Sequence, residues 1–392
     1  MAIYLDNAAT TPVRPEVLAV MEPYFSQKYG NPSSMHRLGL EASSAVSDSR
    51  EKIAKILNCG TDEIIFTSGG TESVNLAIKG VAFAKKKGHM ITQKTEHHAV
   101  LHTCKWLEKQ GFEVTYLDVD RFGLVYPYQV ESAIKDDTIL VSIMYANNEI
   151  GTVQPIKEIA KVCKKKKVLF HTDACQAAGY LNLDVKALGV DLLTINGSKI
   201  CGPKGVGLLF VKKGTSIEPI LHGGGQEFNL RSGTENVPAI VGFAKALELA
   251  QKEKDAEGKK LAKLRDTLIN GLLKIPNSRL NGHLTKRLPN NVNISFYGVE
   301  GESVLLMLNE KGIFASTGSA CSAKSLEVSH VLNALGMSHA WAHGSIRFSL
   351  GRTTSKKDID YVLQVFPKII SDLRGMSPII NRNSTNDGGY VK

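Results

Sequence analysis

Short apolar runs alternate with amphipathic stretches between residues 40 and 255 of the chain. One run, Ile64–Thr67, has the length of a buried strand and is followed by the pair Gly69-Gly70, which is typical of a turn. Thr71 then opens an amphipathic stretch that reaches Gly88 and has the spacing of a helix. Further strands are predicted over residues 89–92, 113–117, 138–143, 168–172, 192–195 and 206–211.

Strands separated by crossover helices predict an α/β fold, with a large, mostly parallel sheet flanked by helices. Ligands in such a fold bind at the carboxyl ends of the strands. The pattern changes after residue 255, where leucines recur at helical spacing and predict one long helix: Leu261, Leu264, Leu268 and Leu272. A smaller α+β unit is then predicted from strands over 291–296, 314–316 and 345–349 and helices near 302–311 and 356–374.

The composition is that of a globular protein with room for about two domains. Of the 392 residues, 43% are hydrophobic and 22% are charged, so wholesale disorder is excluded. The net charge of +10 is spread over short lysine runs such as 85–87 and 164–167. Runs of this kind are typical of a solvated face, and they do not by themselves predict nucleic-acid binding.

Nothing in the sequence predicts a membrane-spanning, secreted or metal-binding protein. No apolar run reaches the roughly 18 residues of a transmembrane helix, and the N-terminal residues do not read as a secretory signal. The 6 cysteines include no CxxC pair and no zinc-like spacing. We therefore expect a cytoplasmic protein with reduced cysteines, no bound metal and no membrane partner.

Polar residues that follow predicted strands bring candidate chemistry to the carboxyl edge of the sheet. The turn at Gly70 and Thr71 exposes backbone N–H groups that can bind an anion, or it is simply a helix cap. Asp173 ends another strand and could pair with a protonated ring nitrogen, or cap the next helix. Lys199 follows a further strand, where an amine can form a Schiff base with a carbonyl compound. Lys204 is the competing lysine, in a sequence more typical of an exposed turn.

An anion site, an acidic residue and a lysine in this order fit pyridoxal 5'-phosphate (PLP), whose phosphate, ring nitrogen and aldehyde each need such a partner. Several longer motifs point the same way, among them Tyr4-Leu-Asp-Asn-Ala-Ala-Thr-Thr-Pro12, Gly30-Asn-Pro-Ser-Ser34, Thr95-Glu-His-His-Ala-Val100, Asn147-Asn-Glu-Ile-Gly151, His222-Gly-Gly-Gly225, Arg231-Ser-Gly-Thr234, Ser316-Thr-Gly-Ser-Ala-Cys321 and Ser345-Ile-Arg-Phe-Ser-Leu-Gly351. Through these motifs the chain resembles the cysteine desulfurases of the NifS/IscS-like group, within the fold-type I (aspartate aminotransferase-like) PLP enzymes. The resemblance runs from residue 4 to about residue 373.

The resemblance implies a large PLP-binding domain over residues 13–257, built on a seven-stranded sheet. It implies a small α+β domain, formed by residues 1–12 and 258–380, that carries a mobile cysteine loop. The polar, Gly- and Asn-rich residues 381–392 are expected to form a loose tail.

Roles around the cofactor follow from the same resemblance. Lys199 is the implied Schiff-base lysine and shuttles the α-proton of the substrate. Asp173 is implied to keep the ring nitrogen protonated, and His97 to stack on the ring and to act as an acid or base. Asn148 and Gln176 are implied to lie near the phenolic oxygen.

The phosphate of PLP has implied contacts on this chain and on a partner subunit. Gly70, Thr71, Asn196 and Ser198 are the contacts on the same chain. Thr234 is implied to reach the phosphate of the partner, so that a homodimer shares its active sites. Relatives often carry His where this chain has Ser198, and we expect weaker or rearranged cofactor contacts but no loss of function.

L-cysteine is the implied substrate. Arg347 is expected to grip its carboxylate by two parallel hydrogen bonds, with Asn31 in a loop near the same end. Cys321 lies among small polar residues, and its thiolate is implied to attack the substrate sulfur, which yields L-alanine and a persulfide. The persulfide sulfur is then passed to an acceptor protein, either a scaffold for iron–sulfur cluster assembly or a carrier for tRNA thiolation.

Other activities stay open at this point. A selenocysteine lyase or another fold-type I lyase would share Lys199 and Asp173 but need not depend on Cys321. A catalytically silent scaffold-binding homologue is disfavoured because Lys199, Asp173, His97 and Cys321 are all present. Direct tRNA binding has only the net charge in its favour, so we expect no nucleic-acid contact.

Overall fold

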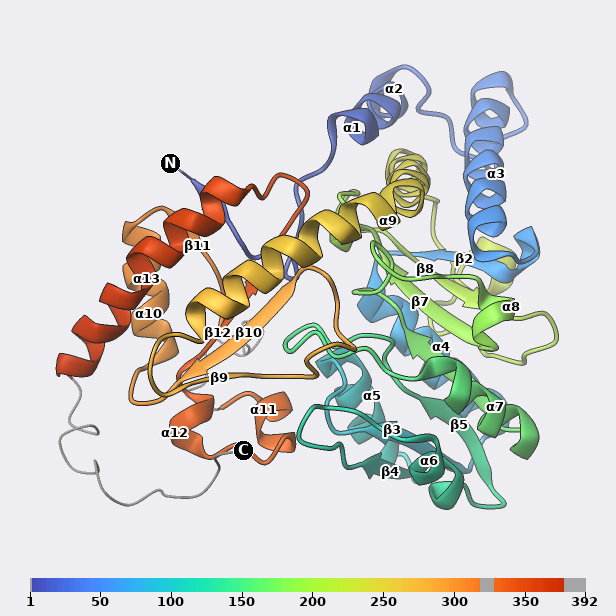
Figure 1. Cartoon of the computed structure of the whole chain (residues 1–392). Helices are drawn as coiled ribbons and strands as arrows, with labels where there is room; N and C mark the ends of the chain where they lie inside the picture. Colours follow the sequence, from blue (N-terminus) through green and yellow to red (C-terminus); the bar gives the residue numbers. More distant parts are fainter. Residues whose placement is uncertain (1, 318–327, 377–392) are drawn as a thin grey trace.

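The computed structural model describes residues 2–317 and 328–376. Its largest sheet has seven strands in the order β2-β8-β7-β6-β5-β3-β4 (Figure 1). Strand β8 runs antiparallel to both of its neighbours, and the other pairs of this sheet are parallel. The α/β fold with a mostly parallel sheet is thereby confirmed. The strands are β2 (Ile64–Thr67), β3 (His89–Gln93), β4 (Glu113–Leu117), β5 (Thr138–Ser142), β6 (Leu169–Asp173), β7 (Leu192–Asn196) and β8 (Gly207–Val211).

Two apolar layers cover the two faces of this sheet. Successive residues of a strand point to opposite faces, so Ile64 and Phe66 pack into one apolar cluster and Ile65 into the other. The first cluster is completed by α3 (Arg37–Leu57), α7 (Ile156–Lys166) and the first half of α9 (Val237–Leu272). The second is completed by α4 (Gly70–Lys85) and α5 (His98–Glu108). Burial on both faces explains why β2 and β8 are nearly continuous apolar runs in the sequence.

A smaller sheet forms the other part of the molecule (Figure 1). Its strands are antiparallel, in the order β12 (Ser345–Ser349), β10 (Asn291–Phe296), β9 (Ser278–Leu280). Helices α10 (Gly301–Glu310) and α13 (Lys356–Met376) pack on it, together with the second half of α9. The N-terminal strand β1 (Ile3–Tyr4) joins this part by pairing in parallel with β11 (Ile313–Phe314).

Helix α9 begins earlier than the sequence predicted. It spans 36 residues from Val237 and therefore crosses the change of pattern near residue 255. Leu247 packs in the core of the large sheet, whereas Leu261 and Leu268 pack in the core of the small sheet. The change in apolar pattern thus marks a change of packing partner and not the start of a helix.

Short helices complete the described chain. They are α1 (Pro15–Met21), α2 (Pro23–Ser26), α6 (Pro127–Ala133), α8 (Val185–Leu188), α11 (His330–Ala334), α12 (His339–Ala342) and the 3-10 turns η1 (Thr61–Glu63), η2 (Gly197–Lys199) and η3 (Glu227–Asn229). Within residues 2–317 and 328–376, every helix is too short or too polar to cross a membrane. The expected boundary after residue 257 falls inside α9, and the expected tail at 381–392 lies outside the described residues.

The small core contains three phenylalanines, and two of their rings contact the third at an angle. Phe366 of α13 is fully buried, and its ring lies 5.0 Å from that of Phe296 and 5.6 Å from that of Phe348. We expect Phe366→Ala to lower the free energy of unfolding by about 3–5 kcal/mol, because it removes buried area and leaves a cavity. Leu306→Ala, at an exposed site of α10, should change it by less than about 0.5 kcal/mol. If denaturant-induced unfolding showed that both variants lose the same free energy of unfolding, the result would contradict this packing.

Candidate active site

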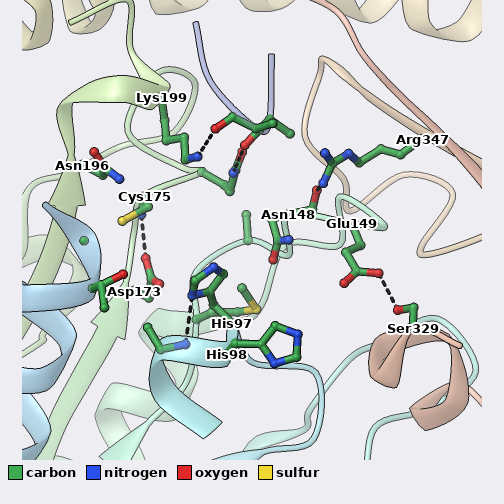
Figure 2. A pocket seen from close by; sticks show the side chains of 18 of the residues that line it. His97, His98, Asn148, Glu149, Asp173, Cys175, Asn196, Lys199, Ser329 and Arg347 are labelled. Carbon is green, nitrogen blue, oxygen red and sulfur yellow. Dashed lines mark hydrogen bonds between the residues drawn. The ribbon is translucent and has the colours of Figure 1, made fainter. Parts of the chain in front are cut away.

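A cavity of about 370 Å³ lies at the carboxyl edge of the large sheet, next to the small sheet. Asp173 is the last residue of β6 and Asn196 the last residue of β7, and both line the cavity. Gly70 and Thr71 line it from the start of α4. Figure 2 shows Asp173 and Asn196 around the cavity together with Lys199, His97 and Arg347. Its volume is in the range of small-molecule and cofactor sites.

The turn before α4 is built to receive an anion. Gly69 has a φ of +149°, a backbone conformation that favours glycine. A Cβ atom on Gly70 would lie 2.9 Å from the sulfur of Cys175, so a side chain there would crowd the cavity wall. The first N–H groups of a helix have no partner within the helix, and they carry the positive end of its dipole. This turn therefore offers backbone donors at the edge of the cavity.

Glu72 holds this turn in place from the first turn of α4. Its Oε2 atom accepts a hydrogen bond from the backbone N–H of Ser68 at 2.9 Å, and its Oε1 atom accepts one from Nε of Arg231 at 2.8 Å. The pKa of Glu72 is lowered: burial raises it, and the bonds from Arg231 and Ser68 outweigh that effect. The carboxylate thus ties residues 68–72 to the segment that carries Thr234.

Asp173 and His97 both line the cavity. One oxygen of Asp173 accepts a hydrogen bond from the backbone N–H of Cys175 at 2.9 Å. His97 is the N-cap of α5, and its Nδ1 accepts the N–H of Ala99 at 3.1 Å. Burial lowers the pKa of His97 while Asp173 acts to raise it. A neutral His97 therefore carries its proton on Nε2.

Lys199 lies in the cavity wall and Lys204 does not. Lys199 ends the η2 turn that directly follows β7, and its ammonium group donates to the carbonyl of Ala9. Lys204 is exposed on the turn beyond it. Of the two lysines considered from the sequence, only Lys199 is positioned to react with a molecule in the cavity.

Arg347 brings a buried positive charge to the other side of the cavity. It is the central residue of β12 and is only 3% exposed. One Nη atom donates to the Asp6 carboxylate at 2.8 Å and the other to the carbonyl of Asn148 at 3.1 Å. Its Nε has no hydrogen-bond partner in the described part of the chain. The guanidinium therefore has a donor available for an anionic ligand.

The cavity gathers most of the residues that the sequence analysis singled out. The predicted residues that line it are Gly70, Thr71, His97, Asn148, Asp173, Gln176, Asn196, Lys199 and Arg347. Ser198 is buried beside it, with its hydroxyl 3.2 Å from Oδ1 of Asn196. Asn31 and Thr234 are exposed and outside its lining. Cys321 lies outside the described residues.

Other residues reach the cavity that sequence reasoning did not single out. Glu149 and Ser329 line it and are bonded to each other at 2.5 Å. The rings of His98 and His330 lie 4.6 Å apart in the same wall, and burial and neighbouring histidines lower the pKa of His98 to about 4. Glu149 lies within one of the quoted motifs, but a motif alone does not show which of its side chains face a ligand.

The cysteines that the structure describes are poor candidates for a nucleophile. Burial raises the pKa of the Cys59, Cys104 and Cys163 thiols to about 12. It also raises the pKa of Cys175 well above the usual value and that of Cys201 less strongly. A thiol reacts as its thiolate, so these side chains fit the structural role expected of them.

The sequence of this chain matches a known protein family. Residues 3–362 match the aminotransferase class-V family. The chain belongs to this family. A cysteine desulfurase IscS of Methanosarcina thermophila is 58% identical over 380 residues, which are 96% of this chain and 94% of the relative. One of Dictyoglomus turgidum is 55% identical over 379 residues, which are 96% of each chain.

Solved structures agree with the sequence comparison. A NifS-like protein is 42% identical, with a TM-score of 0.90 over 95% of this chain and 100% of the other. SspA in complex with cysteine is 40% identical, with a TM-score of 0.79 over 89% of this chain and 99% of the other. The resemblance to the NifS/IscS-like cysteine desulfurases is thereby confirmed.

PLP is the cofactor of this family, and the cavity residues fit it. The turn at Gly70 offers backbone donors for a phosphate, and Gly70 has no side chain that would crowd the cavity wall. Asp173 offers an acceptor for a ring N–H, and Lys199 offers an amine for the aldehyde. These residues therefore match the phosphate, the ring nitrogen and the aldehyde of PLP.

The support that Glu72 gives to this turn can be tested through cofactor affinity. Glu72→Gln removes the charge that holds Arg231, and we expect the loss of about 1 kcal/mol, or roughly fivefold in affinity for PLP. Absorbance titration of the apo protein with PLP measures this change. Glu51→Gln, at an exposed site of α3, is the matched control. Unchanged affinity in Glu72→Gln would show that the turn does not need the contact.

Proposed function

We propose that this PLP-dependent cysteine desulfurase converts L-cysteine to L-alanine and transfers the sulfur to Cys321 as a persulfide. The observation that carries the proposal is a buried Arg347 in the same cavity as Lys199 and Asp173. An amino acid needs a cation for its carboxylate and a cofactor for its amine, and this cavity provides for both. The curated relatives that match nearly the full chain carry the same activity in their names.

Each cavity residue has a task at a stated atom. PLP, when bound, supplies a ring that stabilises negative charge at the substrate α-carbon. Asp173 would accept a hydrogen bond from the ring nitrogen of PLP and so keep it protonated. Lys199 would hold the cofactor through its amine and would move the α-proton of the substrate. His97 would cover the ring and, being neutral, could accept or return a proton.

The remaining contacts position the cofactor and the substrate. Asn148 and Gln176 lie near the phenolic oxygen of the cofactor. Gly70, Thr71 and Asn196 hold its phosphate. The hydroxyl of Ser198 is hydrogen-bonded to Asn196, so Ser198 acts on the phosphate through Asn196. This indirect contact replaces the one that the histidine of relatives makes.

Arg347 binds the substrate carboxylate, with Asn31 near the same end. The Nε–H of Arg347 is available to the substrate carboxylate. Because both groups are charged, the resulting hydrogen bond is charge-assisted. The Asp6 carboxylate and the Asn148 carbonyl each accept a hydrogen bond from one Nη atom, and together they keep the guanidinium in one orientation. The Cys321 thiolate then attacks the substrate sulfur, and the sulfur leaves the β-carbon.

We also propose a cytoplasmic homodimer in which Thr234 completes the phosphate site of the partner. Thr234 is exposed and lies outside the cavity of its own chain, which suits a residue that acts in another subunit. The large domain would comprise residues 13–257 and the small domain residues 1–12 and 258–380. The persulfide sulfur goes to a protein acceptor, an iron–sulfur scaffold or a thiolation carrier, without direct nucleic-acid contact.

The role of Cys321 is tested by alanine and sulfide release from L-cysteine in the presence of reductant. We expect Cys321→Ala to abolish both, because no thiolate receives the sulfur, while PLP absorbance is retained. Cys59→Ala, at a thiol whose pKa is raised by burial, should keep its activity. Equal activity of Cys321→Ala and the wild type would favour a direct lyase, and turnover of selenocysteine by the variant would identify that alternative.

The role of Arg347 is tested by the lysine variant. Arg347→Lys keeps the charge but loses the planar donor pair, and we expect KM for L-cysteine to rise by about 10- to 100-fold. Arg352→Lys is the control, since Arg352 lies outside the cavity lining and pairs with Glu253. A lower kcat with unchanged KM would assign the substrate carboxylate to another residue.

A further inference from the structure

Glu149 is a buried carboxyl group that the mechanism above does not use. It is 5% exposed and lines the cavity. Its Oε2 atom accepts a hydrogen bond from the hydroxyl of Ser329 at 2.5 Å (Figure 2). Its Oε1 atom has no hydrogen-bond partner among residues 2–317 and 328–376. One oxygen is therefore fixed, and the other is available to a molecule in the cavity.

The backbone of Glu149 is held by three asparagine side chains. Oδ1 of Asn147 accepts its N–H at 2.9 Å. The Nδ2 groups of Asn291 and Asn293 both donate to its carbonyl at 3.1 Å. All three asparagines are buried. Such support fixes the position of the side chain in advance, as an acid or base in a reaction requires.

Glu149 lies on the side of the cavity where the substrate sulfur must be. Arg347 donates to the carbonyl of Asn148, the residue before Glu149, and its charge acts on the Glu149 carboxyl. In cysteine, the carboxylate and the sulfur are each attached within two bonds of the α-carbon. A substrate held by Arg347 therefore places its sulfur and its β-carbon close to the wall that contains Glu149.

The reaction needs a group that moves one proton on this side. L-cysteine and the Cys321 thiol become L-alanine and a Cys321 persulfide: the Cβ–S bond breaks, an S–S bond forms, and the electron pair of the broken bond stays with the β-carbon. The reactants carry two thiol protons, whereas the persulfide carries one. The other proton must reach the β-carbon, which becomes a methyl group.

We propose that Glu149 is the acid–base residue that takes a thiol proton and delivers it to the β-carbon. This role rests on the proposed function and adds a second proton-transfer group to it, opposite Lys199. Burial raises the pKa of Glu149 to about 7, with Ser329 and Arg347 acting to lower it. A group with a pKa near the working pH is suited to accept a proton and then return it.

The surroundings of Glu149 contain other titratable groups. Arg347 of β12 is the charge that acts on it, and Asp6 in turn pairs with Arg347. The pKa values of the histidines in the same cavity wall are lowered by burial, so they titrate below Glu149: His97 and His98 from α5 and His330 from α11. Asp173 and Lys199 line the opposite wall.

The test compares the holoenzyme with Glu149→Gln in single turnovers of L-cysteine over a range of pH. Glutamine keeps the size and can still accept from Ser329, so the fold and the affinity for L-cysteine should change little. We expect alanine formation to slow by about 100-fold. In the wild type, kcat/KM should rise with pH through about 7, where Glu149 loses its proton, and the variant should lack this step. Glu302→Gln, at an exposed site of α10, is the matched control.

A readout without turnover tests the same carboxyl group. The pKa of Glu149 in the fold, about 7, is above its value of about 4.3 in an unfolded chain. The unfolded chain therefore releases this proton first, and wild-type stability should fall relative to Glu149→Gln as the pH rises through this window. The difference in Tm between variant and wild type should grow in favour of the variant and level off above pH 7.

The outcomes separate the two proposals. Wild-type turnover together with an unchanged rate and pH profile in Glu149→Gln would overturn the role of Glu149 alone. A slow variant that keeps the step near pH 7 would also overturn it, because another group would then titrate. Absence of alanine with the wild type would overturn the proposed function, and this inference with it. Slow alanine formation by Glu149→Gln, without the rise in kcat/KM near pH 7, supports the proposed role of Glu149.

Discussion

The carboxyl ends of the parallel strands β3, β5, β6 and β7 all lie at one edge of the large sheet, and the site depends on this constraint. Both faces of the sheet are buried, so a polar side chain inside a strand needs a hydrogen-bond partner, as His171 has in Ser142 and Thr194, whereas one at a strand end can face the cavity. Asp173 and Asn196 occupy these ends, and Lys199 follows within one turn. The apolar strands that stabilise the domain therefore also fix where the cofactor groups meet.

The small sheet supplies the substrate side of the cavity. Arg347 lies at the centre of β12, which pairs with β10 on one side, and Arg347 itself forms a bridge with Ser316 on the other. Asp6 and Asn148 approach it from segments far apart in the sequence. Helix α9 runs through both cores. Packing of the two parts thus sets the position of Arg347 relative to Lys199 and Asp173 in the cavity.

Much of this arrangement could be predicted from the sequence because it depends on local patterns. The bounds of β4, β10 and β12 match the predicted ranges 113–117, 291–296 and 345–349, and apolar and polar residues alternate along each of these strands. Lys199 could be singled out because it follows a strand. The full length of α9 could not, because one helix changes packing partner along its course. Glu149 was not singled out because its surroundings are formed by Ser329 and Arg347, which lie far away in the sequence. Whether Cys321, Asn31, Ser198 and Thr234 act as the family resemblance implies stays a prediction.

The proposed reaction transfers the sulfur of L-cysteine to one thiol, that of Cys321. Mass spectrometry of peptides from the holoenzyme, after a single turnover with L-cysteine and without reductant, measures this directly. We expect one additional sulfur atom on the peptide that contains Cys321, together with one equivalent of L-alanine. Alanine formed without added sulfur on that peptide, or with the sulfur on another cysteine, would contradict it.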